Sequence, residues 1–254
     1  MAGLSFGEAS VGQRAIGNKV VDRPYQMPTG WAATADLLAT TYTDASGKGA
    51  STVALVVMQC DSSLDLKPST CQFHSYVQLF KRTEELVDEL KKQTTDGIKG
   101  IFGLGEKMSK SHLDRFQNFE KLPPKQACLA IAGEGLKAES WTEADRKYAE
   151  THFRMVSGLY GVLRPYDDVK PVRDMPMQAR IKTKKGIYLI DFWGDAITKQ
   201  ISKDMKAIVG ETKDCQILLI RIMTDEYFRA VQQHNLPESL NIHHVEIVME
   251  GAPE

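Results

Sequence analysis

The sequence has few cysteines and no excess of charge of either sign. None of its four cysteines forms a C-x-x-C pair. This spacing argues against a disulfide framework and a zinc ribbon, and it favours reduced thiols in a cytosolic protein. The 32 lysines and arginines nearly balance 33 aspartates and glutamates, so a site for a polyanion must be a local patch. No apolar run approaches the ~20 residues that cross a bilayer, and we expect neither a membrane nor a cofactor as partner.

The pattern of apolar residues predicts an α/β (α+β) fold, a single domain with a mixed central sheet flanked by helices. Continuous apolar runs at Val53–Met58, Ala127–Ala132 and Ile217–Met223 are typical of buried strands. Helix-like segments alternate with them, which favours strands and helices sharing one core. The remaining predictions are helices over Phe80–Gln93, residues 192–208 and Asp225–Gln233, and strands over Ile187–Ile190 and Ile242–Met249.

The first 51 residues differ in composition from the remainder. They are rich in Gly, Ala, Ser and Thr and lack sustained periodicity, so we read 1–51 as a loosely structured extension with an optional short helix at Trp31–Thr40. Residues 52–254 then form one domain.

A second helix is predicted to begin at Ser140, where Ser140 and Glu143 have the S-x-x-E spacing of a capping box. Apolar residues then recur at helical spacing as far as Leu159. Gly158 and Gly161 break this helix, and Pro165 prevents its restart. Without further information, this segment is a buried corner between a helix and a strand.

The stretch Ile98–Ser109 (IKGIFGLGEKMS) resembles the helix-hairpin-helix pattern of proteins that bind DNA without sequence preference. Gly103 and Gly105 would allow a tight turn whose amides point outwards, and a helix amino end favours an anion. Lys107 and Lys110 would flank that turn and reach phosphates. An ordinary turn between two helices remains the alternative.

A second basic segment runs from Arg164 to Lys185. Three prolines keep it extended, and arginine forks hold phosphates by two-point contacts. A solvated surface explains the same charges equally well. Its cations are Arg164, Lys170, Arg173, Arg180, Lys182, Lys184 and Lys185, against Asp167, Asp168 and Asp174.

The acid–base candidates are Asp195 and Glu226. A serine nucleophile is disfavoured because Ser157 precedes the first glycine, so no G-x-S-x-G elbow exists. Asp195 could equally cap a helix or pair with Arg154 or Arg164 in the core. No metal site is expected, since the adjacent histidines 243 and 244 would point to opposite faces of a strand.

Three blocks resemble the YaaA peroxide-stress family: HFRMVSGLYGVLRPYD (152–167), IYLIDFWGDAITKQ (187–200) and TDEYF (224–228). The resemblance implies a basic cleft that binds double-stranded DNA without sequence preference, and a role in limiting damage from free iron during peroxide stress. It places Arg154, Arg164 and Arg173 in that cleft. The signature residues are Ser157, Gly158, Tyr160, Gly161, Pro165, Trp193, Gly194, Asp195 and Tyr227.

The sequence also departs from the family pattern. Gln59-Cys60-Asp61-Ser62-Ser63 replaces an S-P-A-K-like loop, and a G-D-x-Y-like run is missing after Ala132. No basic A-K-x-A-R-G-like segment precedes the end at Glu254. We therefore expect a shortened, divergent member that binds DNA as a monomer. Two other hypotheses stay open. One is an enzyme that uses Asp195 and Glu226 beside Arg164, favoured by a perturbed carboxylate in a closed cleft; the other is a purely structural remnant.

Overall fold

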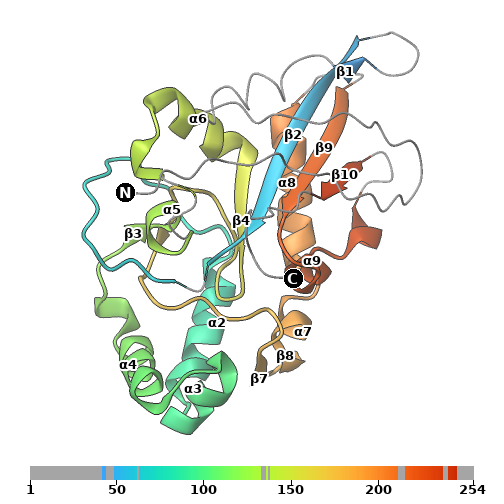
Figure 1. Cartoon of the computed structure of the whole chain (residues 1–254). Coiled ribbons are helices and arrows are strands. Elements are labelled where there is room, and N and C mark those ends of the chain that lie inside the picture. The colour runs from blue at the N-terminus through green and yellow to red at the C-terminus, as the bar shows by residue number, and fades with distance from the viewer. Residues whose placement is uncertain are drawn as a thin grey trace, which may run out of the picture.

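The computed structural model describes residues 42–43, 49–61, 63–132, 136, 138–210, 215–236 and 240–244. Its centre is a mixed sheet of strand order β10-β9-β2-β4-β5 (Figure 1). The pairs β10–β9, β9–β2 and β2–β4 are parallel, and β5 runs antiparallel to β4. This arrangement confirms the predicted α/β class. The strands are β2 (Gly49–Gln59), β4 (Phe153–Ser157), β5 (Gly161–Leu163), β9 (Cys215–Ile222) and β10 (Asn241–His244), with β1 (Tyr42–Thr43) antiparallel to β2.

The chain changes direction around β2. From β2 it crosses to β4 on one side, and after β5 it returns to β9 on the other side of β2. Where the connections of neighbouring parallel strands run to opposite sides of a sheet, a crevice forms outside the carboxyl ends of those strands. Open α/β sheets bind ligands in such a crevice. The residues that follow β2 and β9 meet there.

Helices flank the sheet, and α8 runs behind β2 and β9 in Figure 1. None of the helices in the described ranges is long and apolar enough to cross a membrane. The α-helices are α2 (Phe80–Lys91), α3 (Thr95–Phe102), α4 (Glu106–Gln117), α5 (Ala127–Ala130), α6 (Glu143–His152), α7 (Leu189–Trp193), α8 (Ala196–Val209) and α9 (Asp225–Phe228). Short elements complete the chain: η1 (Phe119–Lys121), η3 (Ala138–Ser140), η4 (Arg229–Val231), η5 (Gln233–Asn235), β3 (Lys125–Gln126) paired with β6 (Asp168–Val169), and β7 (Arg180–Thr183) paired with β8 (Gly186–Tyr188).

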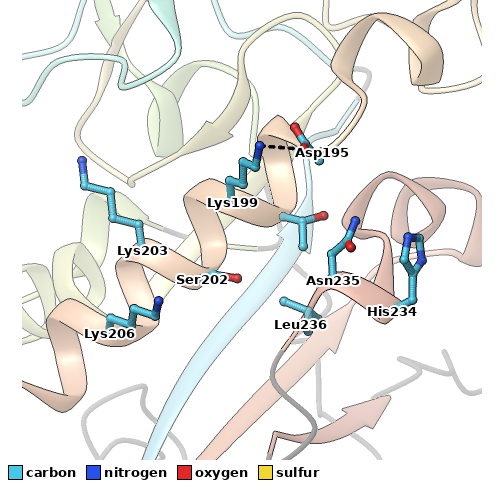
Figure 2. A pocket seen from close by; sticks show the side chains of 9 residues that line it. Asp195, Lys199, Ser202, Lys203, Lys206, His234, Asn235 and Leu236 are labelled. Atoms are coloured by element: carbon cyan, nitrogen blue, oxygen red, sulfur yellow. Dashed lines mark ion pairs between the residues drawn. The ribbon is translucent and has the colours of Figure 1, made fainter.

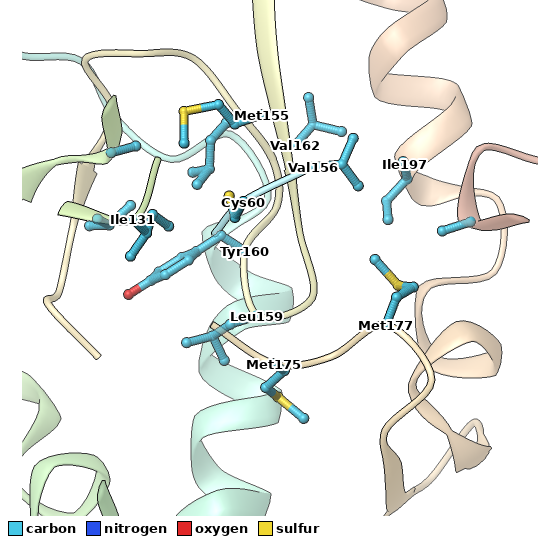
Figure 3. Packing of buried hydrophobic residues seen from close by; sticks show 14 of the residues in the cluster. Cys60, Ile131, Met155, Val156, Leu159, Tyr160, Val162, Met175, Met177 and Ile197 are labelled. Carbon is cyan, nitrogen blue, oxygen red and sulfur yellow. The ribbon is translucent and has the colours of Figure 1, made fainter. Parts of the chain in front are cut away.

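The core packs around the loop that joins β4 to β5 (Figure 3). Tyr160 and Trp193 are fully buried, so both are core aromatics. Their polar atoms are satisfied: the Tyr160 hydroxyl donates to the Lys170 carbonyl at 2.9 Å, and Trp193 Nε1 donates to the Gly158 carbonyl at 2.8 Å. Buried polar groups with partners fix one arrangement of the loop.

The helix before this loop differs from the prediction at both ends. The capping box is formed by Thr142 and Asp145, not by Ser140 and Glu143. The helix then ends at His152, and Phe153–Ser157 is a buried strand against β2. The prediction was wrong because all five residues of β4 are buried between β2 and β5, and this tertiary packing outweighs the helical spacing of their side chains.

Three other elements also differ from the prediction. Ala127–Ala130 is a short helix, where the sequence predicted a strand. The expected helix over residues 192–208 is interrupted at Gly194, whose φ of 51° lies in the left-handed region. Strand β2 begins at Gly49, inside the segment read as an extension, and the Trp31–Thr40 helix lies outside the described residues.

Candidate functional site

The loop between β4 and β5 wraps around one carboxylate, that of Asp174. The hydroxyl of Ser157 donates to Asp174 Oδ1 at 2.5 Å, and the backbone amides of Gly158 and Leu159 donate to the same carboxylate at 3.1 Å each. The Ser157 oxygen in turn accepts the amide of Tyr160 at 2.9 Å. The signature residues Ser157, Gly158 and Tyr160 therefore hold a buried acid from a distant loop.

Burial dominates the electrostatics of Asp174. Removal from water raises its pKa to about 6, although the hydrogen bonds from Ser157 and the loop amides act in the opposite direction. The Asp174 carboxyl therefore titrates at a pH of about 6, well above the range of an ordinary aspartate.

A pocket of about 320 Å³ opens beside Asp174, at the carboxyl ends of β2 and β9. Residues from three separate segments line it, which places it in the crevice expected from the strand order. Arg173 supplies its one guanidinium, among three carboxylates. The lining residues are Gln59, Cys60, Asp61, Arg173, Asp174, Pro176, Gln178, Glu226 and Tyr227.

Two further titratable groups of this pocket are held in their neutral forms. Burial, followed by the neighbouring carboxylates of Asp174 and Asp61, raises the pKa of the Cys60 thiol. Burial likewise raises the pKa of Tyr227, whose hydroxyl donates to the Met175 carbonyl at 3.3 Å. Since a thiolate is the reactive form of cysteine, Cys60 is an inert thiol here.

Of the three arginines assigned to a common cleft, Arg154 and Arg164 both contact Glu150, whereas Arg173 lines the pocket beside Asp174. Arg154 is buried, and its Nε donates to Asp204 Oδ2 at 2.6 Å, with both side chains 6% exposed. Arg164 donates to Asp167 at 2.9 Å and lies 3.6 Å from Glu150. Both guanidinium groups are therefore occupied by carboxylates of the protein.

Arg180 has a different environment. It is exposed on β7, and its guanidinium lies 5.5 Å from the ring centre of Tyr188. Strand β7 contacts α3, so Arg180 lies on an element next to the helical hairpin.

Asp195 and Glu226 occupy different sites. Asp195 pairs with Lys199 at 2.7 Å across one turn of α8 (Figure 2). It is half-exposed and lines a second pocket of about 660 Å³ between α8 and the residues around Asn235. Glu226 lines the pocket beside Asp174, and Arg164 lines neither. The predicted acid–base set of Asp195, Glu226 and Arg164 is therefore not assembled, and the predicted core ion pair of Asp195 is a surface pair.

The stretch Ile98–Ser109 forms two helices joined by Gly103-Leu104-Gly105. Gly103 ends α3 with φ 63°, a conformation that favours glycine, and Gly105 precedes α4. Ser109 packs inside the hairpin and donates its hydroxyl to the Gly105 carbonyl at 3.0 Å. Lys107 and Lys110 are exposed on α4.

Sequence reasoning missed Asp174 as a site residue and counted it only as one charge of a basic segment. Its loop partners are 15 to 17 residues away, so no local spacing reveals the contact. Asp61 was noticed only as a departure from a family pattern. The one usable signal was that polar residues follow two buried strands.

Within the described ranges, no group of three histidine, cysteine or acidic side chains could hold a metal ion. A comparison with protein families adds independent information: the model described as peroxide stress protein YaaA matches residues 55–251. That span is well over half of the chain, and it includes both the pocket and the helical hairpin.

Proposed function

This chain belongs to the peroxide stress protein YaaA family, and on that premise we propose that it binds double-stranded DNA without sequence preference through the hairpin of α3 and α4. Its role is then to limit iron-dependent oxidative damage to DNA, as a monomer in the cytosol. Contacts to phosphates alone explain why no base would be preferred.

The observation that carries the proposal is the open amino end of α4. Gly105 occupies the cap position and offers no side chain to accept the first amides of the helix. Neither packing nor conformation requires a glycine there: a Cβ atom at Gly105 would meet nothing within 4 Å, and its φ is −69°. Because Ser, Asp and Asn are better caps, a glycine favours close approach of a ligand to the amides.

Cations surround this turn. Lys99 on α3 and Lys107 and Lys110 on α4 are exposed, and no ion pair engages them in the part of the chain that the structure describes. Glu106 contributes one negative charge to the same turn, so binding depends on the lysines together. Arg180 adds a further exposed cation on β7, the strand that contacts α3.

The other arginines are not needed by this proposal. Arg154 and Arg164 are paired with carboxylates, and Arg173 lies among three acids that would repel a phosphate. The DNA surface is thus the hairpin with its neighbouring strand, at the end of the molecule where α3 and α4 lie in Figure 1.

The test is a fluorescence anisotropy titration of a labelled duplex over a salt series, with wild type and Gly105→Asp. The new carboxylate would cap α4 and occupy the anion position. We expect DNA binding to be lost while the free energy of unfolding stays constant or rises by a few tenths of a kcal/mol. Ala144→Asp, which adds the same charge to the exposed first turn of α6, should bind like wild type. If wild type fails to bind at low salt, DNA binding is not the function of this chain.

A further inference from the structure

The pocket between the ends of β2 and β9 contains charges of both signs that do not pair with each other. Arg173 lies in it with Asp61, Asp174 and Glu226. Among the described residues, no carboxylate of the pocket lies within ion-pair distance of Arg173, although twelve such pairs occur elsewhere. The protein therefore holds these charges apart.

The three carboxylates have different roles. Asp174 is fully buried, and its oxygens accept hydrogen bonds from Ser157 and the loop amides. Asp61 accepts the Ser63 amide through Oδ1 at 2.6 Å, and its own amide donates to the Ile131 carbonyl at 2.8 Å. Among the residues that the structure describes, one oxygen of Asp61 and both oxygens of Glu226 thus remain for a ligand.

The amide side chain of Gln59 is also oriented. Its Oε1 accepts the amide of Thr224 at 2.8 Å and the hydroxyl of the same residue at 3.0 Å. Both acceptor positions of this oxygen are used, so its NH₂ group is the end left to donate. The pocket consequently presents two donors, Arg173 and Gln59, and two acceptor carboxylates.

Size and charge exclude other classes of ligand. A volume of about 320 Å³ is at the lower end of the range for small-molecule sites, about 300–1,000 Å³. A phosphate chain or a duplex would meet three acids against one arginine, which is repulsive. A simple amine would leave Arg173 without a partner, and a simple acid would leave Asp61 and Glu226 without one. In either case a partly desolvated charge would stay unpaired, which is energetically unfavourable.

We propose that this pocket binds a small zwitterion of the amino-acid class, with its carboxylate on Arg173 and Gln59 and its ammonium group between Asp61 and Glu226. Arginine suits the carboxylate because its planar fork donates two parallel hydrogen bonds. The site is independent of the DNA-binding surface proposed for the α3–α4 hairpin.

The experiment is isothermal titration calorimetry of the full chain with each standard L-amino acid as the probe. Any amino acid that binds is then compared with its amine analogue lacking the carboxylate and its acid analogue lacking the ammonium group. We expect saturable binding of at least one amino acid and roughly tenfold or greater loss for each analogue, since a charged hydrogen bond contributes about 1.5–3 kcal/mol.

Variants locate the site. Arg173→Gln and Glu226→Gln should each weaken binding roughly tenfold or more, whereas Arg229→Gln, an exposed arginine after α9, should bind like wild type. Both pocket side chains are only half-buried, so the fold should survive, and far-UV circular dichroism checks this. Arg173→Lys gives a second measure, because it keeps the charge but removes the fork and should weaken binding less than Arg173→Gln.

Three results would overturn the proposal: no binding by any amino acid, equal binding of the acid analogue, or full affinity in both pocket variants. The outcome is separable from that of the DNA proposal. Gly105→Asp should keep amino-acid binding and lose DNA, and Arg173→Gln should do the reverse.

Discussion

The hydroxyl of Ser157 donates to the carboxylate of Asp174 at 2.5 Å, and this contact joins the loop after β4 to the wall of the pocket. The serine is thereby a structural residue, because its oxygen also accepts two loop amides. A Ser157 nucleophile would have to give up these bonds. Because Asp174 is buried and its pKa is raised, its protonation makes the stability of the fold depend on pH.

The stability of the protein should fall as pH rises through the titration of Asp174. The pKa of this group is about 6 in the folded protein, against roughly 3.9 in an unfolded chain. Its protonated form therefore stabilises the fold fully below about pH 4, and this stabilisation is lost as pH rises through about 6. We expect wild type to lose about 2 kcal/mol relative to Asp174→Asn between about pH 4 and pH 7. Urea unfolding of both proteins over this range measures the difference, and a gap that stays constant would contradict it.

Gly158 should be intolerant of any side chain. A Cβ atom there would lie 2.0 Å from the Met175 carbonyl oxygen, so the backbone next to Asp174 would have to move. We expect Gly158→Ala to lower the free energy of unfolding by about 3 kcal/mol or more. Gly100→Ala is the matched control, since nothing lies within 4 Å of its Cβ position in α3, and it should stabilise by about 0.5–1 kcal/mol. Equal effects of the two changes would refute this account.

The central strands were predictable because the sequence pattern that indicates each strand lies within the strand itself. Val53–Met58 and Ile217–Met223 are continuous apolar runs, and both lie in strands buried between neighbours. The run Ala127–Ala132 looked similar but is helical at its start, because small apolar residues suit a buried helix equally well. Strand β4 was missed because its apolar residues also fit the period of the preceding helix.

The candidate site was predictable only in part. Glu226, Tyr227 and Arg173 were identified from motifs and charge, and the structure places all three at one pocket. Their relation to Asp174 and Asp61 depends on the return of the chain across β2, which no spacing encodes. For the same reason the sequence did not reveal that Arg154, which the family resemblance placed in a basic cleft, pairs with Asp204, 50 residues away.

Arg154 should contribute to stability rather than to ligand binding. Its guanidinium and Asp204 are almost fully buried together, so Arg154→Met would leave an unpaired buried carboxylate. We expect a loss of about 3–5 kcal/mol in the free energy of unfolding, measured by urea denaturation. The double change Arg154→Met/Asp204→Leu should recover most of it, because it removes both charges. A small loss in the single variant would mean that Asp204 is solvated.

Lys107 and Lys110 should each account for one phosphate contact if the hairpin binds DNA. Each contact to duplex DNA contributes about 0.9 to the slope of log K against log salt. Replacing both lysines by glutamine should therefore reduce the slope by about 1.8 and weaken binding to duplexes of any sequence equally, which anisotropy over a salt series would measure.

Lys147→Gln is the control for net charge, because this exposed lysine lies on α6 and pairs with Glu143. If its effect equals that of either hairpin lysine, the attraction is a property of overall charge, and the open amino end of α4 has no special role. If only the hairpin changes reduce the slope, the amides after Gly105 and the two lysines act as one phosphate site.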